Sequence, residues 1–108
     1  MPAVEPAYRY RATVNRVVDA DTLLLDIDLG FRVNVAIPIR VRGVNAPELR
    51  TEEGERAREW AVQFLHLGKI VVETYRDRRS FERWVADVYV DGEPLADALI
   101  EAGHGVAV

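Results

Sequence analysis

The chain contains no cysteine, only 2 histidines among its 108 residues, and a single lysine, Lys69. The absence of cysteine excludes disulfide bonds and thiolate metal sites. Two histidines make a zinc site built mainly from imidazoles improbable. Any metal site in this chain would therefore bind a hard cation through oxygen ligands.

A positive net charge is also lacking, since the formal charge is −4. Proteins bind duplex DNA mostly by neutralising its phosphates, so the negative net charge argues against a broad basic surface for duplex DNA. It does not exclude a small basic cleft. Almost all cationic side chains are arginines, which suits phosphate oxygens but also follows from a GC-rich genome. No apolar run reaches membrane-spanning length, and the N-terminus has no apolar signal core. We therefore expect a cytoplasmic chain without membrane contact, although a trimmed sequence would look the same.

The length supports one domain, expected at residues 8–108 after a proline-containing flexible lead-in at residues 1–7. Alternation of apolar and polar residues predicts strands, and a stripe with helical spacing predicts helices. The expected strands lie at residues 8–15, 23–29, 31–42, 69–75 and 83–90, and the expected helices at residues 57–65 and 94–102. Pro38 cannot donate to a strand ladder, so it should lie at an edge, bulge or bend.

Three strands, a helix, two strands and a second helix form the element order of an OB-fold. The expected class is therefore α+β, mainly β: a five-stranded Greek-key barrel with two packed helices. Other small α+β folds share this order, so the order alone leaves them open.

Three groups of polar residues interrupt the patterning where strands begin or end. They are Asp19 with Asp21, Arg40 with Glu48, and Arg83 beside Phe81 and Trp84. Each group has an ordinary interpretation, because aspartates cap local turns and arginines or glutamates at strand ends are often solvated. Their combination in one short chain is more specific than any one of them.

The motifs "VVDADT", "IRVRGVNAPE", "FERWVADVYVDG" and "ADALIEAGHGVAV" together resemble the staphylococcal nuclease (thermonuclease-like) family. The resemblance runs from about Tyr8 to the last residue. It implies an OB-type barrel with packed helices. It also implies calcium-dependent hydrolysis of phosphodiester bonds in DNA or RNA that leaves a 3′-phosphate.

By position, the resemblance assigns three residues to Ca²⁺: Asp21, Asn45 and the backbone carbonyl of Ala46. Asp19 matches an acid of the outer shell. Asn45 is a departure, because the best-known members have an aspartate there. An amide oxygen still coordinates calcium, but affinity follows ligand charge, so the expected site is weaker. The alternative is that Asn45 is only a turn residue.

The resemblance assigns Arg40 and Arg83 to the scissile phosphate and Glu48 to the attacking water as general base. This chemistry is reasonable, since arginine forks stabilise charge that grows on phosphoryl oxygens and water needs a proton acceptor. The chain ends soon after the second helix and lacks the family's further tyrosines, so substrate contact is expected from Phe81 or Trp84.

The leading hypothesis is therefore a calcium-dependent nuclease that acts as a monomer on DNA or RNA, preferably single-stranded. One alternative is a catalytically weak or inactive OB-fold module that only binds nucleic acid. The net charge and Asn45 favour this alternative, whereas both arginines and Glu48 favour the enzyme. Another alternative is a domain cut from a larger protein whose partner supplies substrate contacts.

Overall fold

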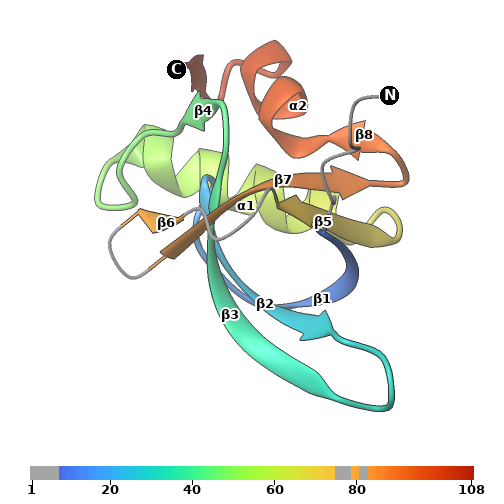
Figure 1. Cartoon of the computed structure of the whole chain (residues 1–108). Coiled ribbons are helices and arrows are strands. Elements are labelled where there is room, and N and C mark those ends of the chain that lie inside the picture. The colour runs from blue at the N-terminus through green and yellow to red at the C-terminus, as the bar shows by residue number, and fades with distance from the viewer. Residues whose placement is uncertain (1–7, 75–78, 81–82) are drawn as a thin grey trace, which may run out of the picture.

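The computed structural model describes residues 8–74, 79–80 and 83–108, and for Arg79, Ser80 and Arg83 it describes the backbone. The expected lead-in at residues 1–7 and the expected substrate contact Phe81 lie outside the described residues. The described elements form a curved sheet with one helix against it and a second helix near the C-terminus (Figure 1).

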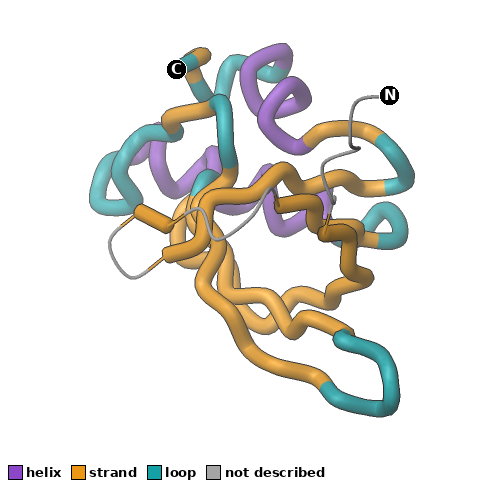
Figure 2. The backbone as a smooth tube through the Cα atoms, in the orientation of Figure 1, coloured by secondary structure: helices purple, strands orange, loops and turns teal. Residues whose placement is uncertain are grey.

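Five strands form a closed barrel, and two helices accompany it. This confirms the expected OB-like α+β fold class. The barrel strands are β1 (Tyr8–Asp19), β2 (Thr22–Asp28), β3 (Asn34–Val41), β5 (Ile70–Thr74) and β7 (Arg83–Val90). Neighbours in the order β3-β2-β1-β5-β7 are antiparallel. The barrel closes where β3 and β7 pair in parallel, with Ile39 opposite Trp84 and Arg40 opposite Val85 (Figure 2).

The remaining elements are short strands and two helices. They are β4 (Val44–Asn45), α1 (Glu52–Leu65), β6 (Arg79–Ser80), β8 (Glu93–Pro94), α2 (Leu95–Glu101) and β9 (Val106–Ala107). Both helices were predicted, but α1 begins earlier than its apolar stripe because Thr51 caps it. The short strands were not predicted, since two residues are too few to show alternation.

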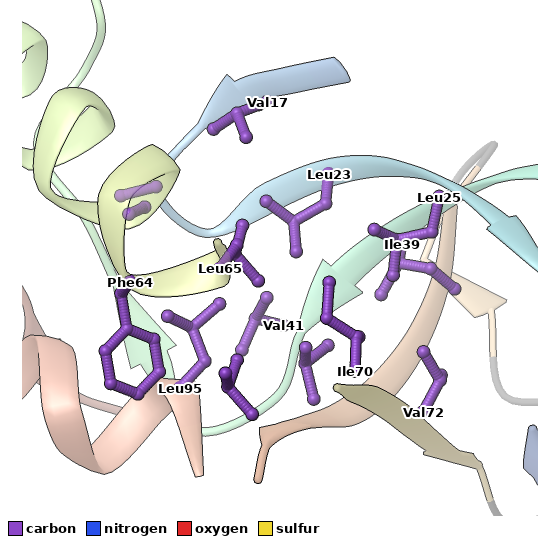
Figure 3. Packing of buried hydrophobic residues seen from close by; sticks show 14 of the residues in the cluster. Val17, Leu23, Leu25, Ile39, Val41, Phe64, Leu65, Ile70, Val72 and Leu95 are labelled. Carbon is purple, nitrogen blue, oxygen red and sulfur yellow. The ribbon is translucent and has the colours of Figure 1, made fainter. Parts of the chain in front are cut away.

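Side chains from the barrel interior and one face of each helix make the core (Figure 3). Leu23 and Leu25 alternate inward along β2, and Val41 ends β3 against them. Leu95 of α2 closes the same core. Burial of each leucine contributes about 1.5–3 kcal/mol, so this core holds the strand ends in place.

The expected strand at residues 31–42 is wrong in its first part, because β3 begins at Asn34. Gly30, Phe31 and Arg32 have φ values of +81°, +54° and +61°, which belong to a turn. The Gly30 N–H donates to Asp28 Oδ1 over 2.8 Å and fixes this turn. Phe31 is consequently 99% exposed at the tip of the β2–β3 hairpin.

Pro38 lies where the sequence predicted, at an open edge. It is in register with Leu24 of β2, whereas the pairing of β3 with β7 begins only at Ile39. The missing N–H of proline therefore costs no ladder hydrogen bond on that side. Across the described residues, neither helix has the length and apolarity needed to cross a membrane.

Candidate functional site

Asp21 and Arg40 meet at one end of the barrel. Asp21 lies in the turn between β1 and β2, and the register of β2 with β3 places Thr22 opposite Arg40. Arg40 Nη2 lies 3.5 Å from Asp21 Oδ2, and the two side chains are only 19% and 12% exposed. The Val41 N–H also donates to the Asp21 carbonyl over 2.9 Å. The two residues are therefore fixed by the barrel and not by a mobile loop.

The segment after β3 brings Asn45 and Ala46 to the same place. Arg40 Nη2 donates to Asn45 Oδ1, and the Ala46 N–H donates to Asp21 Oδ2 over 2.8 Å. Asn45 belongs to β4, which pairs with β9, and Asn45 is opposite Val106 in the register. The C-terminal segment thus braces the strand that carries Asn45, and nothing in the sequence pattern indicated this contact.

Arg42, the neighbouring arginine of "RVRG", belongs to a different cluster. It forms a bidentate pair with Asp87 of β7, with distances of 3.0 Å to Oδ1 and 2.8 Å to Oδ2. Tyr89 is part of the same outer face: burial raises the pKa of its phenol, and Asp87 and then Glu73 raise that pKa further. Of the two arginines at the end of β3, only Arg40 contacts Asp21 in the described part of the chain.

Glu48 lies in the loop between β4 and α1, with its carboxylate largely exposed. Its Oε2 accepts from Arg50 Nε over 2.7 Å, with side-chain exposures of 67% for Glu48 and 84% for Arg50. Within the described residues its ion pair is with Arg50 and not with Arg40. An ion pair this exposed contributes at most about 1 kcal/mol, so it leaves Glu48 able to take other partners.

The backbone of Glu48 is held much more firmly than its side chain. The Glu48 carbonyl accepts from the Thr51 N–H over 3.0 Å and from Thr51 Oγ1 over 2.7 Å. Thr51 Oγ1 in turn accepts from the Gly54 N–H over 3.0 Å and so caps α1. A Cβ at Gly54 would lie 1.7 Å from the Glu48 carbonyl oxygen. The close approach of the loop to the helix therefore requires glycine.

Gly54→Ala is expected to destabilise the fold by about 1–3 kcal/mol or more, because the loop must move away from the helix. Helix propensity alone predicts the opposite, a gain of about 1 kcal/mol. Urea unfolding followed by circular dichroism measures the difference. Glu59→Ala on the exposed face of the same helix is the control and should change stability by less than about 0.5 kcal/mol. A Gly54→Ala variant more stable than the parent chain would contradict the close contact.

The other predicted residues are placed only in part. The backbone of Arg83 begins β7, and the next residue is in register with Ile39, so Arg83 starts beside the strand of Arg40. Asp19 ends β1 half-buried, opposite Thr22.

Trp84 faces the barrel interior together with Ile39, and both line a cavity of about 290 Å³. The cavity is lined by Tyr8, Tyr10, Ile27, Leu29, Ile37, Ile39, Val72, Thr74 and Trp84. Alternation along β3 turns Arg40 away from this interior. A substrate contact at Trp84 stays a prediction.

Asp21, Asn45 and the Ala46 carbonyl supply only oxygen ligands, as calcium requires. The described residues contain no cluster of three or more histidine, aspartate or glutamate side chains suited to a metal. Two of the side-chain oxygens nevertheless converge on one cationic group, Arg40 Nη2. The guanidinium of Arg40 thus lies between Asp21 and Asn45. As ligands for calcium, these groups would carry the single formal negative charge of Asp21, which is typical of a weak site.

Two contacts of the Glu48 loop escaped the sequence-based prediction: Arg50 as partner of Glu48, and Thr51 as the cap that holds the loop. Thr51 did carry a signal. It precedes three acidic residues in the first turn, Glu52, Glu53 and Glu55, a pattern typical of helix starts. No comparable signal marked Arg50.

Comparison with protein families gave no matching family model. The chain is similar to two rice proteins (Oryza sativa subsp. japonica), the probable staphylococcal-like nucleases CAN2 and CAN3, with 30% identity over 66 residues in each case. The match covers 61% of this chain but 18% of CAN2 and 17% of CAN3. The chain thus spans less than a fifth of these relatives, and the similarity connects it with nucleases of the staphylococcal type.

Proposed function

We propose that this chain is a calcium-dependent nuclease of the staphylococcal type that hydrolyses phosphodiester bonds of DNA or RNA. The observation that carries the proposal is the convergence of Asp21, Arg40 and Asn45 at one end of the barrel. The similarity to the two rice nucleases supports the same function. The preference for single strands, the 3′-phosphate product and the monomeric state belong to the same proposal, and the 3′-phosphate product rests on the sequence resemblance.

In the proposed reaction, Arg40 and Arg83 bind the equatorial oxygens of the scissile phosphate, where negative charge grows in the transition state. Glu48 accepts a proton from water as the water oxygen bonds to phosphorus. The bond from phosphorus to the 5′ oxygen breaks, and that oxygen takes a proton from solvent. A bound calcium ion would supply further polarisation of a phosphoryl oxygen. Asp21, Asn45 and the Ala46 carbonyl would hold it.

A cleavage assay on single-stranded DNA tests the proposal directly, with CaCl₂ in one arm and a chelator in the other. Calcium-dependent shortening of the strand is the expected result. No cleavage above the chelator control, together with measurable DNA binding, would favour the alternative of a binding module. The exposure of Glu48 and its pairing with Arg50 are the observations that favour that alternative.

Calcium affinity is expected to be weak, with a Kd on the order of 10⁻⁴ to 10⁻³ M. Asn45→Asp should tighten it, because the variant adds a formal charge beside Asp21 and Arg40. Isothermal titration calorimetry with CaCl₂ measures both values. Asn34→Asp adds the same charge to an exposed position at the start of β3 and serves as the control. Sub-micromolar binding by the parent chain, or no gain from Asn45→Asp, would show that Asn45 is not a ligand in a weak site.

A further inference from the structure

The guanidinium of Arg40 bridges the two side chains assigned to calcium. Its Nη2 donates to Asn45 Oδ1 and lies 3.5 Å from Asp21 Oδ2. Asp21 Oδ2 also accepts the Ala46 N–H over 2.8 Å, and Asp21 Oδ1 accepts the Thr22 hydroxyl over 3.1 Å. The oxygens that face a common point are therefore bound to a cation of the protein itself.

The other half of the fork is anchored to the backbone. Arg40 Nη1 donates to the Val41 carbonyl over 2.7 Å and contacts the Asp21 carbonyl at 3.4 Å. These contacts hold the base of the fork near the barrel end whether or not Nη2 keeps its two partners. Because the guanidinium is a rigid plane, Nη2 leaves Asp21 and Asn45 only when the whole group turns, and these backbone contacts keep it near the barrel end.

We infer that Arg40 competes with a divalent cation for Asp21 and Asn45, and so sets the metal affinity of this chain. Calcium needs these oxygens at about 2.3–2.6 Å, and an ion there repels the guanidinium that now donates to Asn45 Oδ1 and pairs with Asp21 Oδ2. When Asp21 and Asn45 turn to a divalent cation, Arg40 loses both partners and its fork becomes available to a phosphate.

The biological role of this coupling rests on the proposed nuclease function. The competition between Arg40 and a divalent cation can be measured whether or not the chain is a nuclease. Linkage between two binding events is reciprocal. A phosphate that draws Arg40 away must raise calcium affinity by the same factor by which calcium raises phosphate affinity. The site would then take up metal and substrate cooperatively.

The test is a calorimetric titration of CaCl₂ into the parent chain, Arg40→Gln and Arg42→Gln. Arg40→Gln removes the competing charge and is expected to tighten calcium binding by about tenfold, within the range usual for coupling between sites. Arg42→Gln removes the same charge from the same strand end, where it pairs with Asp87, and should change Kd less than about twofold. Adding Asp21→Asn to Arg40→Gln should abolish the gain.

Unchanged or weaker calcium binding by Arg40→Gln would overturn the inference, and so would an equal gain from Arg42→Gln. If Arg40→Gln does not fold, the parent chain still decides the question. Exchange of the Arg40 Nη protons with solvent, followed by NMR, should accelerate on addition of CaCl₂ while that of the Arg42 Nη protons stays unchanged. Unaltered exchange at saturating calcium would refute the competition. A failed cleavage assay would disprove the nuclease proposal and leave these binding results intact.

Discussion

Glu48→Gln is expected to lose about 10² to 10⁴ in cleavage rate at saturating calcium, while its affinity for single-stranded DNA stays the same or improves. The substitution keeps the shape of the side chain and removes the proton acceptor, and a positioned general base contributes about this factor. Removal of one negative charge near the substrate phosphate should help binding. Single-turnover cleavage and fluorescence anisotropy measure the two effects separately.

The structure offers a sharp control for this variant. Glu52→Gln removes the same charge four residues away, at the exposed start of α1, and should leave the cleavage rate within about twofold. The hydrogen bonds that fix the Glu48 backbone come from Thr51, so Glu48→Gln should melt like the parent chain. If the parent cleaves and Glu48→Gln cleaves equally well, Glu48 is not the base. If the parent fails to cleave, the binding module is the better hypothesis.

The strands of the barrel could be predicted because buried apolar residues alternate with more exposed residues along their sequence. Leu23, Leu25 and Ile27 alternate with partly buried or exposed residues along β2, and all three are buried in the structure. The pairing of β3 with β7 brings together residues more than forty positions apart. Alternation says nothing about such partners, so closure of the barrel came from the element order and the resemblance.

The errors have local causes. Phe31 and Val33 continue the alternation of β3, but Gly30 starts a turn in which Phe31 and Arg32 adopt positive φ. An alternating pattern cannot distinguish a strand from an exposed hairpin tip. The start of α1 was placed too late because its first turn is acidic and solvated, and a hydrophobic stripe does not extend over such residues.

For the candidate site, the sequence predicted that Asp21, Arg40 and Asn45 meet, but not how they bind one another. Within the described residues, Glu48 pairs with Arg50 and not with the predicted Arg40. Asp21, Arg40 and Asn45 were assigned by resemblance, and the structure brings all three together. The contact of Arg40 with both residues assigned to calcium depends on side-chain geometry that no motif encodes. The ion pair of Arg50 with the Glu48 carboxylate and the requirement for glycine at position 54 likewise depend on geometry that no motif encodes.

Arg40→Ala and Arg83→Ala are each expected to lower turnover by about a hundredfold or more, with much smaller effects on folding. Both side chains are assigned to charge that develops in the transition state, and loss of such a group typically costs about 10² to 10³ in rate. The assay belongs at saturating calcium, so that the tighter metal binding expected without Arg40 does not hide the loss. Arg42→Ala is the matched control for charge near the site.

Arg40→Ala has a second expected effect. Arg40 donates to Asn45 and to the Val41 carbonyl, so Arg40→Ala should also lower the thermal midpoint by a few degrees, whereas its rate loss should persist well below that temperature. Near-normal turnover in either variant would remove that arginine from the phosphate site. Rate losses as large in Arg42→Ala would mean that general electrostatics, and not a bidentate grip on the phosphate, explains the effect, because Arg42 is bound to Asp87 on another face.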